Sequence, residues 1–324
     1  MSVRREWGTL SRRERIAYTD AVLCLQFKSA LNPADQIPGA RSRFDDFVGT
    51  HINQTLTIHY TVYEQSLRNE YGYKGVHPHW DWTLFSDNTE GGPVFDGSST
   101  GMSGNGEFVA DKGDLFLVLP GFDDVNLPAG NGGGCITSGP FANMSVNLGP
   151  VFLPINGGGS ITGSGLDYKS RCLVRDIGSA INNKYSNATA VADLLTQNSD
   201  IYWFQTVMQG VLGSGSIGVH GGSHYNIAGN PGADTFISPG DPAFYLHHGM
   251  IDRTWCLWQN QDPANRLNAI PGTGTFMNGP PSANTTLDTL IDAGFAGNTR
   301  YGPIAMKDLM STVAGPSCYT YHLL

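Results

Sequence analysis

The stretch SPGDPAFYLHHGMIDRTWCLWQ, residues 238–259, decides the fold. It opens on Asp241-Pro242, a strong helix start, because Asp is favoured at the N-cap and Pro at the first helical position. Four residues then recur at helical steps of four, three and four positions: Phe244, His248, Ile251 and Trp255. This spacing predicts a helix to about Gln259 whose apolar stripe faces the core and carries one histidine at its centre.

His248 needs partners for both ring nitrogens if it is buried. Taken alone, such a residue is more often a satisfied core histidine than a metal ligand. Asp252 lies one turn further on and is placed to orient it or a neighbour. His247 points roughly 100° away on the helix, which predicts a supporting or structural role.

A second pair of histidines precedes this helix in HGGSH, residues 220–224. His220 and His224 are four positions apart, so a helix places both rings on one face. The two glycines weaken helix propensity but allow close approach of a ligand or another helix. An HxxxH pair alone is a weak metal signal. Together with His248 it makes three converging imidazoles plausible, a donor set that suits Cu, Zn, Fe or Ni.

The N-terminal part adds another histidine pair. Residues 41–59 read as a helix on which His51 and His59 fall within about 80° of one another. A capping box at Ser11 and Glu14 predicts a helix to about Phe27, and residues 62–71 predict a short third one. The alternative is that His51 and His59 are simply exposed on the helix surface. Core-facing histidine pairs on separate helices are typical of a dinuclear site in a helical bundle.

Composition bounds the remaining possibilities. The 324 residues carry a net charge of -9 and no long Lys/Arg run, which argues against nucleic acid or an anionic membrane as partner. No apolar run reaches the roughly 20 residues of a membrane span. Of the 42 glycines, 19 fall in residues 86–165, a loop-rich insertion. We expect one mainly α domain over 1–324, with long Gly-rich loops and little β.

Five cysteines are present and none is spaced as CxxC, which argues against a zinc ribbon or a thioredoxin motif. We expect a disulfide between Cys135 and Cys172, because both lie in Gly-rich loop surroundings; buried free thiols are the alternative. Four sequons are candidate glycosylation sites: Asn53, Asn143, Asn187 and Asn284.

Residues 238–259 resemble the second-copper signature of the tyrosinase and catechol oxidase family of type 3 copper proteins. In that family an Asp-Pro-x-Phe start precedes the ligand, here His248. VHGGSHYNIAG resembles the segment with the other two ligands of this copper, and THINQTLTIHYT resembles the first-copper segment. The resemblance implies copper ligands at the following positions: His51, His59, His220, His224 and His248.

The resemblance also implies an activity: oxidation of o-diphenols to o-quinones with molecular oxygen at two coppers, with monophenol hydroxylation in some members. A zinc hydrolase also fits HxxxH plus a distant His, but HGGSH lacks the Glu that would act as base. No Asp or Glu lies in residues 201–219 and Gly221 follows His220, whereas relatives that hydroxylate monophenols often carry an acidic residue and an Asn there. This favours diphenols.

One departure from the family concerns the first copper. A Trp-His-Arg segment supplies its third ligand in relatives, but here Thr61 runs directly into Val62, and about a dozen residues are missing. His77 and His79 are the only nearby substitutes. The alternative function is therefore an impaired or non-catalytic homologue that binds copper mainly at the second site. A spliced isoform, a gene-model error and a real loss all explain the gap.

The resemblance to short fungal members implies a secreted protein. The first fifteen residues, MSVRREWGTLSRRER, are charged and polar, where a signal peptide would need an apolar stretch.

Overall fold

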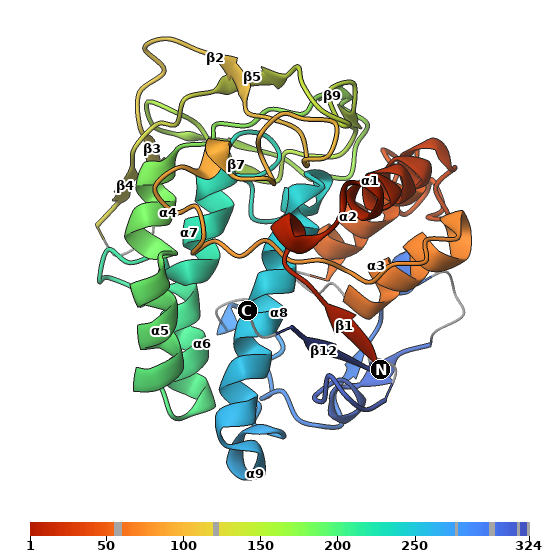
Figure 1. The fold of residues 1–324 in the computed structure, drawn as a ribbon, viewed down its shortest axis with the longest axis vertical. Helices are drawn as coiled ribbons and strands as arrows, with labels where there is room; N and C mark the ends of the chain where they lie inside the picture. Colours follow the sequence, from red (N-terminus) through yellow and green to blue (C-terminus); the bar gives the residue numbers. More distant parts are fainter. Residues whose placement is uncertain (55–59, 119–122, 276–277, 298–301, 316–317, 323–324) are drawn as a thin grey trace.

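The computed structural model describes residues 1–54, 60–118, 123–275, 278–297, 302–315 and 318–322. Helices dominate, as the sequence predicts, and the described strands are two to four residues long and pair only in twos. A long helix, α8 (Ala243–Gln261), runs through the middle of the molecule (Figure 1). The predicted fold class, mainly α with little β, is confirmed.

Two groups of helices flank α8 (Figure 1). One group comes from the N-terminal part: α1 (Arg12–Phe27), α2 (Arg43–Asn53) and α3 (Tyr60–Ser66). The other precedes α8 in sequence: α4 (Ser179–Tyr185), α5 (Ala188–Gln197), α6 (Ile201–Gln209) and α7 (Gly218–Ile227). The main core joins both groups through fully buried aromatic side chains on α8, among them Tyr245 and Trp258.

The predicted helices of the N-terminal part form with one truncation. The capping box of Ser11 and Glu14 starts α1. The helix expected over 41–59 is α2, which ends at Asn53, and residues 55–59 lie outside the described part. The short helix expected over 62–71 is α3 followed by a π-helical turn, η2 (Leu67–Tyr71).

The two ends of the chain meet beside α8. Strand β1 (Ser2–Arg4) pairs in parallel with β12 (Tyr319–Tyr321).

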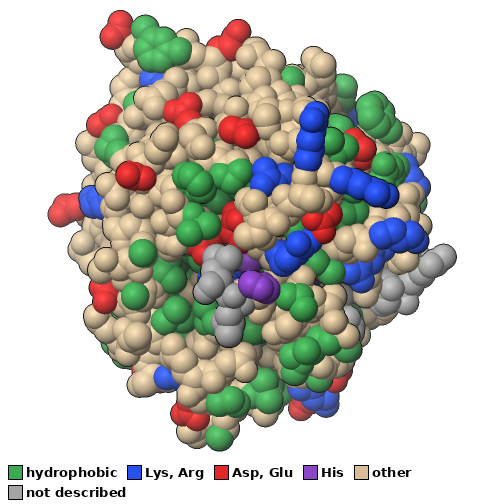
Figure 2. All heavy atoms as spheres, in the orientation of Figure 1, with side chains coloured by type: hydrophobic (Ala, Val, Ile, Leu, Met, Phe, Trp, Pro, Cys, Tyr) green, Lys and Arg blue, Asp and Glu red, His purple; other side chains and the backbone are tan. Residues whose placement is uncertain are grey.

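Although the chain is acidic overall, Lys and Arg side chains gather over α1 and α3 (Figure 2), where Arg12, Arg13 and Arg68 are exposed. Among the described residues, no helix is both long and apolar enough to cross a membrane.

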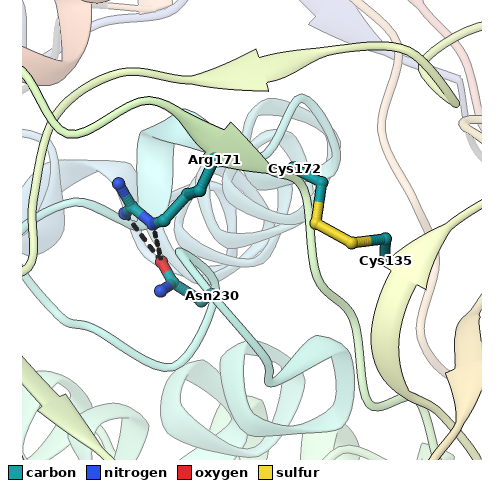
Figure 3. Close-up of a disulfide and its surroundings, with 4 residues drawn as sticks. All are labelled: Cys135, Arg171, Cys172 and Asn230. Carbon is teal, nitrogen blue, oxygen red and sulfur yellow. Dashed lines mark hydrogen bonds between the residues drawn. A yellow bond between two sulfur atoms is a disulfide. The ribbon is translucent and has the colours of Figure 1, made fainter.

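The Gly-rich insertion caps one end of the helices (Figure 1). Its strands are short and pair across the segment: β2 (Gly106–Phe108) with β5 (Gly133–Ile136), β3 (Leu115–Leu117) with β4 (Val125–Leu127), β6 (Ser145–Val146) with β9 (Arg171–Cys172), and β7 (Phe152–Pro154) with β8 (Ser160–Thr162). The expected disulfide between Cys135 and Cys172 is present and joins β5 to β9 (Figure 3).

A buried ion pair fixes this insertion to the start of α8. The Arg175 guanidinium donates two hydrogen bonds of 2.7 Å to the Asp241 carboxylate, and both side chains are inaccessible to solvent. Arg175 also donates to the carbonyl of Met102 at 2.8 Å. One oxygen of Asp241 in turn accepts the Ala243 N–H in the first turn of α8, so the Asp-Pro start both begins the helix and anchors the insertion.

Candidate metal site

Three histidines from two helices converge on one point. His220 and His224 lie on α7 and His248 lies on α8. Their Nε2 atoms are 3.1 Å apart between His220 and His224, 3.0 Å between His224 and His248, and 3.4 Å between His220 and His248. We call these three residues the histidine cluster.

The sequence explains why α7 and α8 can bring these rings together. The pair on α7 shares one face because it is spaced by four residues. A side chain at Gly222 would lie 2.5 Å from Ser186 Oγ and 2.6 Å from Tyr185 Cβ, so the glycine lets α7 pack directly on the end of α4. On α8 the Phe244 ring stacks on His248 at a centroid distance of 4.1 Å and holds it in place.

Burial keeps the cluster neutral near pH 7. Desolvation lowers the pKa of His220 from 6.5 to about 4 and that of His248 to about 3, and it lowers the pKa of His224 well below 6.5. Charge on His51 would lower all three further. A neutral imidazole has one nitrogen lone pair available for a metal, which is the form that coordination requires.

One residue outside the predicted set orients the cluster. His220 Nδ1–H donates to Gln209 Oε1 at 2.6 Å, which leaves Nε2 as the atom with the lone pair. Such outer partners fix the tautomer and ring orientation of a metal-binding histidine. Gln209 ends α6 and precedes His220 by eleven positions across a loop, so no spacing rule marks it in the sequence.

His247 packs against the cluster from the buried side. Its ring centroid is 4.4 Å from that of His224 and 5.3 Å from that of Trp82. Its nearest nitrogen lies within 4.8 Å of the ligand atoms of the other three histidines. Burial lowers the pKa of His247 well below 6.5, so a neutral ring packs on the buried side of the cluster.

His51 reaches the same region from α2. Its Nδ1–H donates to the Phe236 carbonyl at 2.7 Å, so its Nε2 carries the lone pair, as in His220. Its ring meets Phe244 edge-on, and Phe244 is the ring that stacks on His248. Burial lowers the pKa of His51 to about 4. His51 is nevertheless not among the histidines whose ligand atoms lie within 4.8 Å of one another.

The other residues predicted for the first copper do not complete it in the described part of the chain. His59 lies outside the described residues. His77 Nε2–H donates to the Tyr245 carbonyl at 2.8 Å, and the His79 ring packs edge-on against Tyr321. Both are buried against α8, and neither joins His51 in a group of metal-ligating atoms among the described residues.

The structure corrects the role expected for Asp252. Its Oδ2 accepts hydrogen bonds from the hydroxyls of Tyr319 (2.7 Å) and Tyr321, and from Arg4 Nη1 at 3.1 Å. The carboxylate therefore ties α8 to the paired terminal strands rather than orienting His248. Although Asp252 lies one turn after His248, its carboxylate accepts from these hydroxyl and guanidinium donors and not from the imidazole.

The histidine cluster fits a metal ion. Three Nε2 atoms separated by 3.0–3.4 Å can all lie about 2.0 Å from one ion, the usual metal–imidazole distance. A site of neutral imidazoles without thiolate or carboxylate suits copper, as it also suits zinc, iron or nickel.

Comparison with known proteins identifies the class. The sequence model described as "Common central domain of tyrosinase" matches residues 41–261. This segment includes α2, α7 and α8 and hence every predicted ligand. The chain belongs to the tyrosinase family of type 3 copper proteins, whose members hold a dinuclear copper centre.

Similar proteins extend this match over nearly the whole chain. It is 37% identical over 333 residues to Tyrosinase P of Aspergillus terreus, covering 98% of this chain and 91% of that protein. It is 35% identical over 352 residues to N-acetyl-6-hydroxytryptophan oxidase of Emericella nidulans, covering 99% and 92%. A solved polyphenol oxidase variant from Thermothelomyces thermophila superposes with a TM-score of 0.89 at 43% identity, covering 100% and 89%. The chain is thus a tyrosinase-family oxidoreductase.

Proposed function

We propose that this protein oxidises o-diphenols to o-quinones with molecular oxygen. Two diphenols and one O₂ give two quinones and two water molecules, so each ring loses two electrons and two protons. Bound copper would supply the electron transfer between the phenol and oxygen. The observation that carries the proposal is the set of three neutral imidazoles whose Nε2 atoms lie within 3.4 Å of one another.

We propose His220, His224 and His248 as ligands of the second copper, and His51 and His59 as ligands of the first. The His51 tautomer supports this assignment, because its hydrogen bond to Phe236 leaves Nε2 available in the same way as Gln209 does for His220. His247 supports the cluster as a neutral packing residue. Within this arrangement the protein's own contribution is to fix ring orientation and to keep the imidazoles unprotonated.

A substrate can reach the second copper from the Gln209 side. His220, His224 and His248 are partly exposed although His247 is fully buried, and Gln209 itself is exposed at the end of α6. A phenol ring would therefore approach the second copper across the partly exposed rings of the histidine cluster. Since Gln209 offers an amide and not a carboxylate, no acidic side chain on α6 is available to accept a phenol proton, which favours diphenols over monophenols.

A second candidate function is a one-copper homologue with impaired activity. It is favoured by one observation: among the described residues, the only group of ligand atoms that could hold a metal consists of the histidine cluster and His247. In this case the second copper binds tightly, and the first is held weakly by His51 and His59 without a third ligand.

Copper quantitation and a catechol oxidation assay separate the two. A diphenol oxidase requires two coppers per chain at saturation and quinone formation from catechol. Near one copper per chain and no quinone would leave only the second candidate. Rapid hydroxylation of a monophenol without a lag would overturn the preference for diphenols.

We further propose that the chain is one domain that is secreted and glycosylated. Three of the sequon asparagines are exposed and accessible to a glycan: Asn53, Asn143 and Asn284. Asn187 is also a sequon, but its side chain caps α5 by accepting the Ala190 N–H and donates to the Asn183 carbonyl. Mass spectrometry before and after enzymatic deglycosylation of protein from a fungal host tests each site, with Asn187 expected to be the least occupied.

A further inference from the structure

A cavity of about 140 Å³ lies where the Gly-rich insertion packs on the C-terminal end of α7. It is separate from the histidine cluster, and no residue of that cluster lines it. Six apolar residues in its wall are buried: Leu115, Leu153, Pro154, Ile181, Ala228 and Ala233. Pro128 and Ile155 also line it and are exposed, so the cavity opens to solvent on their side.

The wall of this cavity carries no free charge. Asp176 lines it, but its carboxylate pairs with Lys112 Nζ at 2.9 Å and accepts the Gly132 N–H. The Lys112 ammonium also donates to the carbonyls of Gly130 and Gly132, which uses all three of its donors. A charged ligand would find no counter-charge here, so the cavity favours a neutral one.

Two polar side chains in the wall differ in how they are used. The Tyr225 hydroxyl interacts with Thr235, so Tyr225 offers mainly the apolar face of its ring. Asn230 Oδ1 accepts from Arg171 Nε at 3.0 Å and Nη2 at 2.7 Å. This fixes the amide and leaves Nδ2 directed away from Arg171 (Figure 3). Asn230 lines the cavity, and Nδ2 is the amide atom that the contact with Arg171 leaves to donate to a ligand oxygen.

The wall is rigid before any ligand binds. The disulfide between Cys135 and Cys172 joins two strands beside it (Figure 3). Val174 bridges Cys135 on one side and Asn230 on the other, with reciprocal N–H to O=C distances of 3.0 Å to Asn230. A preformed wall reduces the ordering entropy that a ligand must overcome.

We propose that this cavity binds one neutral, single-ring molecule that carries a hydroxyl or carbonyl oxygen. An engineered apolar cavity of about 150 Å³ in another protein binds benzene, so the volume suits one six-membered ring. The ring would lie on the apolar floor and its oxygen would accept from Asn230 Nδ2. The proposal is independent of the proposed oxidase function, although Tyr225 follows His224 directly on α7 and links the two regions.

The test uses the full-length copper-loaded protein and 4-fluorobenzyl alcohol, which has no phenol hydroxyl to oxidise. Binding is followed by fluorine NMR line broadening and by the rise in melting temperature. Ala129 and Ala233 line the cavity, and A129L or A233L fills it; A142L is the matched control, a half-buried alanine of the insertion outside the lining. We expect A129L to weaken binding by at least about tenfold, since added atoms in a packed wall exclude the ring, and A142L to leave it unchanged.

Asn230→Asp tests the oxygen contact separately. Aspartate keeps an oxygen for Arg171 but removes the Nδ2 donor, so 4-fluoroacetophenone, whose carbonyl can only accept, should lose its advantage over fluorobenzene while fluorobenzene binds as before. Two results would overturn the proposal: no binding up to the solubility limit, which means that the cavity holds only water, or binding that A129L and A233L leave intact. Should A233L fail to fold, A129L at the cavity rim still decides the question.

Discussion

The two proposed copper half-sites differ in how many of their ligands lie in the described part of the structure. The second is built from α7 and α8, and its three histidines converge with Nε2 separations of 3.0–3.4 Å. The first is represented in the described residues by His51 alone, which has the correct tautomer but no neighbouring ligand within the metal-binding group. Three proposed ligands of one copper lie on two packed helices, α7 and α8, whereas the other copper would draw on His51 of α2 and on His59, which lies outside the described residues.

The largest effect is expected when a proposed ligand of the second copper is removed. His248→Ala should abolish tight copper binding, with a loss in affinity greater than the ~10–100-fold typical of an outer partner. The measurement is copper retained after dialysis against a competing chelator. His322→Ala, at an exposed position, is the control and should retain copper fully. Unchanged retention in H248A would place the tight copper elsewhere.

Removing His51 tests the incomplete half. His51→Ala should leave the tight copper in place and reduce catechol oxidation to background, since the first copper, which oxygen reduction also requires, loses a proposed ligand. Copper content and quinone formation are measured on the same sample. Loss of the tight copper in H51A would show that the two halves are not separable.

Acid should destabilise the fold through buried histidines outside the histidine cluster, which separates loss of the fold from loss of a cluster ligand. Burial lowers the pKa of His51 and His77 from 6.5 to about 4 and that of His79 to about 3. The unfolded chain therefore binds more protons below pH 6.5, and stability is lost as the pH falls toward those values. Urea unfolding of the copper-free protein should lose about 1.6 kcal/mol per such histidine between pH 6.5 and 5.

His79 provides the matched variant for this pH dependence. Neither of its ring nitrogens has a hydrogen-bond partner in the described structure, and its ring packs on Tyr321. His79→Phe should keep the packing and remove one histidine's share of the acid sensitivity. If the pH profile of stability is identical in H79F and the parent protein, His79 does not contribute to the acid sensitivity.

The smallest effect is expected at Gln209, which is not itself a proposed metal ligand. Gln209→Leu removes the acceptor for His220 Nδ1–H and should weaken the tight copper about 10–100-fold. Gln209→Glu retains an acceptor and should keep tight binding. Because Gln209 is exposed, neither change should disturb folding, as circular dichroism can verify. Equal copper affinity in Q209L and Q209E would exclude this positioning role.

Much of the fold follows from local sequence rules. Capping residues and 3.6-residue periodicity predict α1 and α8, because both helices bury one apolar stripe and begin at strong caps. The convergence of His220, His224 and His248 is partly predictable, since a spacing of four places the first two on one face of α7. The expectation that His248 faces the core is not met in full, because all three histidines are partly exposed. The disulfide follows from the need to staple a Gly-rich loop.

Other features depend on tertiary contacts that no spacing encodes. Gln209 meets His220 only because α6 ends where α7 begins, and Asp241 pairs with Arg175 across 66 positions of the chain. Asp252 was assigned to the wrong neighbour because its partners, Tyr319 and Tyr321, lie on a strand at the far end of the sequence.

A copper titration of the protein separates the two proposed half-sites. We expect two steps: one tight copper per chain at the histidine cluster, and a second at least about 100-fold weaker, held by the two proposed ligands His51 and His59. Catechol oxidation, where it occurs, should follow the second step. Two coppers of equal affinity, or no tight copper at all, would contradict the account.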